Sequence, residues 1–181
     1  GSATSKSLLV VRGFVRICRH VILLVSVFVN ALGKVANDLR DPPDYVVGCH
    51  LLFYPNWIDF WNGNTAYLEK HFGTRALWEG YYRSTNREEF KKLFQADMDY
   101  AEAMGAEYVV FHVSDVSNEE IFSYRWEHTD REIFDASAEL LNELTDGRDY
   151  HFKLLLENLF TPGHHFIDPA ETEYLLDHVR Y

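Results

Sequence analysis

Three residues that can bind a metal ion, His50, His112 and Glu157, each follow a short apolar run of the sequence. The runs are YVVGCH, AEYVVFH and FKLLLEN, and each is typical of a parallel strand that is covered on both faces. Two imidazoles and one carboxylate are a known open zinc set, which leaves a fourth position for water or substrate. One histidine after a strand is more often an ordinary polar residue, but three ligand residues at equivalent places favour a shared metal site.

The strands that carry these residues must be parallel neighbours if the side chains are to meet. Strands are predicted at Tyr45–Cys49, Tyr108–Phe111 and Lys153–Leu156, with helices between them at about Arg87–Met104 and Asp130–Leu144. Strands that alternate with helices predict right-handed crossovers and a parallel sheet. The carboxyl ends of parallel strands lie at one edge of the sheet, which is where α/β barrels carry their chemistry. The predicted fold class is therefore α/β.

Capping signals predict where the helices begin. Thr85 and Thr129 are each followed three residues later by a glutamate, which is the spacing of a capping box. Asp168 is a capping residue with Pro169 at the first helical position, so a further helix is predicted after it. The segment between His50 and the first of these helices is rich in aromatic residues and is predicted to be a loop.

The stretch from Asp44 to Tyr181 resembles the xylose-isomerase-like TIM barrels, a family of sugar and sugar-phosphate isomerases, epimerases and apurinic endonucleases. The resemblance covers about three quarters of the chain. It is carried by VVGCHLLFYPNWIDFWNGN, GAEYVVFHVSDVSNEEIFSYRW and LLLENLFTPGHHFIDPAETEYLL.

The resemblance implies TIM-barrel-like strand–helix units, present here as a partial barrel of about four parallel strands where a full barrel has eight. The chain then divides into residues 44–181, the barrel portion, and residues 1–43, an N-terminal segment that the family pattern matches poorly. That segment is expected to supply the first strand, at about Ser7–Phe14, and a helix. The later metal ligands of the family have no counterpart in this sequence.

The resemblance also implies that His50, His112 and Glu157 hold one divalent metal ion, and that Glu157 is catalytic because it moves a proton. Zn or Mn is the expected cofactor, although mixed imidazole and carboxylate ligands also suit Fe and Co. Three functions stay open. One is a sugar or sugar-phosphate isomerase or epimerase that works through a metal-stabilised enediolate, and another is a metal-dependent phosphodiester hydrolase of the apurinic endonuclease type. The third is a non-catalytic portion of a barrel.

Aromatic and polar residues after His50 are candidates for contacts with a sugar substrate. Trp57 and Trp61 can stack on the C–H faces of a sugar, and Asp59 can accept hydrogen bonds from its hydroxyls. The alternative is that these rings form a lid that packs on the top of the barrel. His164 and His165 follow the third of these runs and can reach the same mouth, although adjacent histidines in a loop are more often solvated.

Charge and cysteine content bear on partners and compartment. The net charge is −11, which argues against broad binding to nucleic acid because phosphates need basic surface. Cys18 and Cys49 are too few for a disulfide scaffold, which favours a cytoplasmic protein. The apolar run Val21–Val29 is shorter than the about twenty residues of a spanning helix, so no membrane partner is expected. The open edges and bare interior of a partial barrel predict a homo-oligomer.

Overall fold

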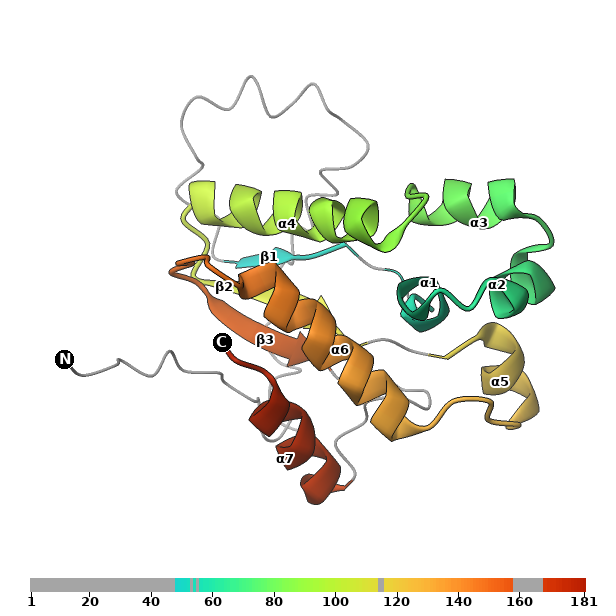
Figure 1. Ribbon diagram of the computed structural model, residues 1–181. Coiled ribbons are helices and arrows are strands. Elements are labelled where there is room, and N and C mark those ends of the chain that lie inside the picture. Colours follow the sequence, from blue (N-terminus) through green and yellow to red (C-terminus); the bar gives the residue numbers. More distant parts are fainter. Residues whose placement is uncertain (1–47, 53, 55, 114–115, 158–167) are drawn as a thin grey trace, which may run out of the picture.

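A three-stranded parallel sheet forms the centre of this computed structural model (Figure 1). The strands are β1 (Gly48–His50), β2 (Tyr108–His112) and β3 (Lys153–Glu157), in the order β1-β2-β3. The α/β class and the parallel, neighbouring strands predicted from the sequence are confirmed. Three strands in one sheet do not show a TIM barrel. The structure describes residues 48–52, 54, 56–113, 116–157 and 168–181 of the 181.

The predictions for residues 1–43 lie outside the described residues, as do Tyr45 to Val47 of the first predicted strand. The candidate histidines 164 and 165 lie outside them as well. No helix in the part of the chain that the structure describes is long and apolar enough to cross a bilayer.

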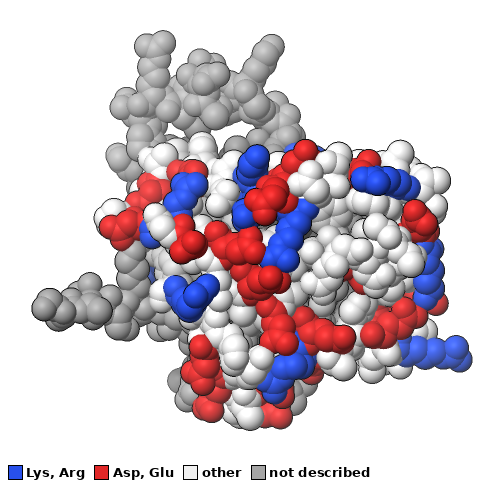
Figure 2. All heavy atoms as spheres, viewed as in Figure 1, with Lys and Arg blue, Asp and Glu red and all other residues white. Residues whose placement is uncertain are grey.

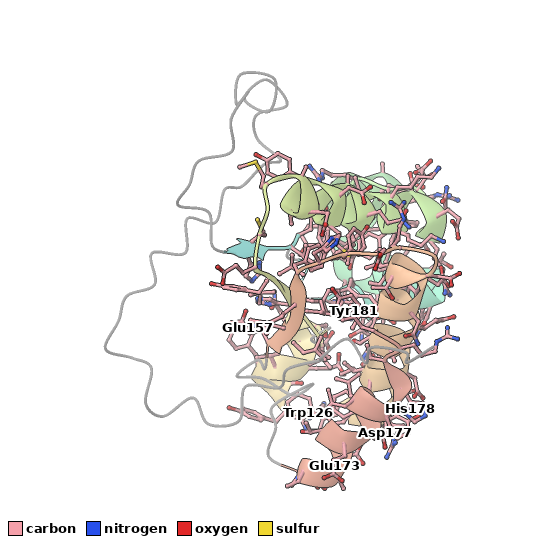
Figure 3. All side chains as sticks on the ribbon, turned by 90° about the vertical axis from the view of Figure 1, so that its left-hand side faces the viewer. Trp126, Glu157, Glu173, Asp177, His178 and Tyr181 are labelled. Atoms are coloured by element: carbon pink, nitrogen blue, oxygen red, sulfur yellow. The ribbon has the colours of Figure 1, made fainter. Side chains whose placement is uncertain are left out.

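Alternate residues of the strands lie on opposite faces of the sheet. Val109, Phe111 and Leu154 are fully buried on the face that packs against helices. Figure 3 shows these helices, α4 (Arg87–Ala103), α6 (Asp130–Thr145) and α7 (Pro169–His178), on one side of the sheet. Because side chains alternate with a period of two, His112 and Glu157 belong to the other, less covered face. The apolar composition of the strands predicted burial on both faces. The structure shows one buried face and one partly exposed face, so that prediction is wrong.

The segment predicted as an aromatic loop is helical, so that prediction is wrong. It forms α1 (Ile58–Asn62), α2 (Thr65–Phe72) and α3 (Arg75–Tyr82). Gly63 and Gly73 follow α1 and α2 with φ values of 70° and 88°, in the region that glycine adopts without a steric penalty. Each glycine therefore ends a helix of only five or eight residues, too short for a recognisable apolar period to build up in the sequence.

Aromatic rings fill the space between these short helices and α4. The Phe60 ring lies 4.6 Å from the ring of Tyr82 and 5.1 Å from that of Phe90, measured between centroids. Phe90 continues the contact to Phe94 at 5.2 Å. All four side chains belong to one buried cluster. The aromatic segment thus packs against α4, and this packing determines the path of the chain after β1.

The capping predictions are confirmed for two helices and wrong for one. Thr129 accepts from the Glu132 N–H to cap α6, and Asp168 accepts from the Ala170 N–H to cap α7. α4 begins at Arg87 as predicted, but its cap is Asn86 and not Thr85, since the side chain of Asn86 accepts from the Glu89 N–H. A further capping box, not predicted from the sequence, opens α5 (Asn118–Ser123).

We expect the Thr129→Ala substitution to lower the free energy of unfolding by about 1 kcal/mol, because one N–H of the first turn loses its acceptor. Thr74→Ala is the matched control, since Thr74 occupies the cap position of α3 without making a side-chain cap hydrogen bond. Urea unfolding followed by circular dichroism measures both changes. Equal losses in the two variants would show that the cap of α6 contributes nothing specific.

Candidate metal centre

His50, His112 and Glu157 converge at the carboxyl ends of the three strands. His50 Nε2 lies 2.7 Å from His112 Nε2 and 3.4 Å from Glu157 Oε2, and His112 Nε2 lies 2.9 Å from the same oxygen. The three residues form the one group among the described residues whose side-chain atoms are placed to share a metal ion. Each separation is shorter than twice a metal–ligand bond of about 2.0–2.2 Å, so one ion can contact all three atoms.

The register of the sheet explains this convergence. His112 is the direct partner of Glu157 across β2 and β3, while His50 is the partner of Val110. His50 therefore lies two residues behind His112 on the same face, and its imidazole reaches diagonally across the pleat. Neighbouring parallel strands are about 4.8 Å apart, which lets long side chains at such positions meet.

The three groups also influence one another's protonation. Hydrogen bonds from His112 and His50 lower the pKa of Glu157 to about 2, so its carboxylate keeps a negative charge across the usual range of pH. The hydrogen bond to Glu157 in turn raises the pKa of His50 above its ordinary value, against the opposing effect of burial. A cation at this position would compete with the protons that the imidazole nitrogens donate to the carboxylate.

A backbone hydrogen bond favours one tautomer of neutral His50. Its Nδ1 lies 2.7 Å from the carbonyl oxygen of Leu51. A carbonyl oxygen can only accept, so Nδ1 must carry the hydrogen and donate it. In this tautomer Nε2 carries a lone pair that faces His112 and Glu157, which is the arrangement that a metal-binding imidazole needs. Nε2 donates to Glu157 only when the ring is protonated.

The centre is partly open to solvent. The side chains of His50 and His112 are 19% and 14% exposed, whereas that of Glu157 is 45% exposed. Figure 3 labels Glu157 at the end of β3, on the side of the sheet away from α7. The two imidazoles are thus the more buried ligands of the centre, and the carboxylate is the most exposed one.

The side chains predicted to bind substrate are placed inside the fold. Trp57, Asp59 and Trp61 are 1%, 2% and 2% exposed. The indole N–H of Trp61 donates to Glu139 at 3.0 Å, and the guanidinium of Arg87 lies 3.6 Å from a Trp61 ring centroid. These contacts match the alternative of packed aromatic rings better than that of a sugar-stacking wall. Their role in substrate binding stays a prediction that burial does not favour.

Asp59 belongs instead to a buried ionic cluster that the sequence did not predict. His128 lies between two carboxylates, with its Nε2 3.2 Å from Asp59 Oδ2 and its Nδ1 3.1 Å from Glu120 Oε1. Glu120, which is 1% exposed, also accepts from the Tyr67 hydroxyl at 2.6 Å. These four residues, named here the His128 cluster, join α1, α2, α5 and the segment before α6. They are far apart in the sequence, so no spacing signal reveals them.

The His128 cluster holds its charges strongly. Hydrogen bonding to Asp59 raises the pKa of His128 to about 9, despite the opposing effect of burial. Burial tends to raise the pKa of Glu120, but hydrogen bonds from Tyr67, from backbone N–H groups and from His128 together lower it to about 2. Both ring nitrogens of His128 are engaged by carboxylates, so this imidazolium is a fixed structural cation and not a free acid or base.

No protein-family model, curated protein or solved structure matches this chain in sequence or structure comparison.

Proposed function

We propose that this chain binds a divalent metal ion through His50, His112 and Glu157 and acts as a sugar or sugar-phosphate isomerase or epimerase. The observation that carries the proposal is the meeting of two Nε2 atoms and one Oε2 atom within 3.4 Å at the carboxyl ends of neighbouring parallel strands. Support also comes from the resemblance of these strand ends to the xylose-isomerase-like barrels. Zn and Mn suit this mixed ligand set.

The three residues of the centre have different roles in the proposed reaction. When bound, the metal ion polarises the oxygens of a keto or hydroxy sugar and favours loss of a neighbouring proton. His50 and His112 are the more buried ligands and orient the site. Glu157 is the most exposed of the three, so its carboxylate can face a substrate, and in this proposal it accepts the proton that moves between carbons.

Charge favours a small substrate over nucleic acid. Figure 2 shows Asp and Glu side chains spread over one face of the molecule and interleaved with Lys and Arg, rather than a continuous basic surface. Arg87 and Lys91, for example, are both paired with Glu143. Paired cations are poorly available for neutralising phosphates along a nucleic acid. Hydrolysis of a phosphodiester is therefore the second candidate, and a non-catalytic portion of a barrel is the third.

We expect the Glu157→Gln substitution to lower catalysed proton exchange by at least about 100-fold, because it removes the charge and the proton acceptor while keeping the shape. The assay incubates Mn²⁺- or Zn²⁺-loaded protein in D₂O with a panel of aldoses, ketoses and their phosphates. Loss of the C–H signal beside the carbonyl is followed by NMR. An enediolate intermediate exchanges this hydrogen with solvent, whereas phosphodiester hydrolysis does not.

Glu173→Gln, an exposed change on α7, is the matched control and should exchange like the wild type. Exchange that persists in Glu157→Gln would remove the proposed catalytic role. Cleavage of bis(p-nitrophenyl) phosphate by metal-loaded wild type, with no exchange on any sugar, would favour the hydrolase. The homo-oligomer expected from the sequence remains a prediction, and light scattering of the same samples tests it.

A further inference from the structure

One peptide group connects the metal centre to a carboxylate on α4. This group, named here the 51–52 peptide, consists of the carbonyl of Leu51 and the N–H of Leu52. Its oxygen accepts from His50 Nδ1 at 2.7 Å, and its N–H donates to Asp97 Oδ2 at 2.9 Å. A continuous path of hydrogen bonds thus runs from the Asp97 carboxylate through one peptide to the imidazole whose Nε2 faces the centre.

The 51–52 peptide is held in place on both sides. The Leu51 N–H donates to the carbonyl of Val110 at 3.0 Å, which joins the chain directly after β1 to β2. The Leu51 side chain is 2% exposed and belongs to the hydrophobic core. The Leu51 carbonyl is therefore held in its orientation toward His50. A change in the hydrogen bond between the Leu52 N–H and Asp97 can then affect the hydrogen bond between that carbonyl and His50.

From this geometry we infer that Asp97 is a positioning residue for the metal centre, acting on His50 through the 51–52 peptide. The inference rests on the proposed metal site. A negative charge accepting from the Leu52 N–H polarises the peptide and makes the Leu51 oxygen a stronger acceptor. The stronger acceptor holds hydrogen on Nδ1 and increases the electron density at Nε2. Carboxylates that contact the outer nitrogen of a metal-bound histidine do this directly in many proteins.

The energetics of Asp97 separate this role from a structural one. Burial raises the pKa of Asp97 to about 6, although the Leu52 N–H and nearby Arg83 act in the other direction. Asp97 is thus still ionised at neutral pH, but its charge costs free energy at this buried place. An uncharged side chain of the same shape is therefore expected to leave the fold equally or more stable. If Asp97 served only to stabilise the fold, replacing its carboxylate by an uncharged side chain would instead lower the stability.

The test is the Asp97→Asn substitution, which keeps an acceptor for the Leu52 N–H and removes the charge. We expect calorimetric titration with Zn²⁺ to show binding about tenfold weaker than in the wild type, while the midpoint of thermal unfolding stays the same or rises. Asp99→Asn is the control on the same helix. Its carboxylate contacts Arg148 and Tyr150, not the 51–52 peptide, so its affinity for Zn²⁺ should equal that of the wild type.

A second measurement reports on His50 without metal. Long-range proton–nitrogen NMR of the metal-free protein, above the pKa of His50, distinguishes hydrogen on Nδ1 from hydrogen on Nε2. We expect the Nδ1–H form to dominate in wild type and Asp99→Asn and to lose population in Asp97→Asn. Weaker Zn²⁺ binding with an unchanged tautomer would reject the route through the peptide.

The two proposals fail in different ways. A wild-type chain that binds no metal would overturn the proposed function, and Asp97 would then lose its role at a metal centre even if the tautomer responds. Wild-type binding that Asp97→Asn reproduces, with the same tautomer in both, would overturn the inference about Asp97 and leave the metal site intact.

Discussion

Replacing His50 and His112 together by alanine is expected to weaken Zn²⁺ binding by more than about 100-fold, since changes to the partners of metal ligands already cost 10–100-fold. Only Glu157 of the three ligands then remains, and one carboxylate on the surface is a poor site for zinc. Calorimetric titration with Zn²⁺ and Mn²⁺ measures the loss. If wild type and the double variant bind alike, or neither binds, the site assignment is wrong.

The matched control for this change is the pair His151→Ala and His178→Ala. Both histidines are exposed, and neither belongs to the group of described residues placed to share an ion. The wild-type affinity should also fall as the pH is lowered, because protons compete for the imidazole nitrogens. The raised pKa of His50 means that this competition begins at a higher pH than for an ordinary imidazole of pKa about 6.5.

Loss of Glu120 is the substitution with the largest expected effect on stability. We expect Glu120→Ala to lower the free energy of unfolding by about 3–5 kcal/mol, because it leaves His128 charged and poorly compensated in the interior. The backbone N–H groups of Glu127 and His128, which donate to Glu120 at 2.7 Å and 3.0 Å, lose their acceptor as well. Urea unfolding with a fixed slope measures the change.

Glu127→Ala is the control for this prediction. Glu127 pairs with Lys70 at the surface, where both side chains are 46% exposed, and such pairs contribute less than about 1 kcal/mol. A loss in Glu120→Ala no larger than in Glu127→Ala would show that the His128 cluster does not stabilise the fold.

The stability difference between wild type and Glu120→Ala should also depend on pH. The folded-state pKa of His128 is raised to about 9, so the stabilisation by its charge is complete below the unfolded value of about 6.5 and is lost as the pH rises through about 9. The pKa of Glu120 is lowered to about 2, so its contribution is complete above about 4.5 and is lost as the pH falls toward 2. The difference should therefore be largest between about pH 4.5 and 6.5.

The parts of the fold that local chemistry determines were predictable from the sequence. The runs before His112 and Glu157 are apolar and bounded by polar residues, and β2 and β3 lie there. Thr129 with Glu132, and Asp168 with Pro169, carry capping chemistry that only a helix start uses fully. The convergence of the three ligands follows from parallel pairing, because equivalent ends of parallel strands must share an edge.

The parts that depend on distant contacts were not predictable. The segment of α1 to α3 carries aromatic residues without a clear period, and its rings are ordered by packing on Phe90 and Phe94 of α4. At the start of α4 both Glu88 and Glu89 are possible partners for a capping residue, and local spacing does not choose between Thr85 and Asn86. The His128 cluster depends on residues brought together only by the finished fold.

The strands lie in the sheet in the same order as along the chain. During synthesis the neighbour of β2 and the neighbour of β3 have therefore each been synthesised before the strand itself, so neither strand depends on a later segment for its pairing. His50 and His112 come from the first two strands of this sheet, but Glu157 comes from the third. The ligand set is complete only after the last strand docks. A metal ion held by all three residues would bind the assembled sheet in preference to any partly folded state, and by mass action it would protect that assembly against unfolding.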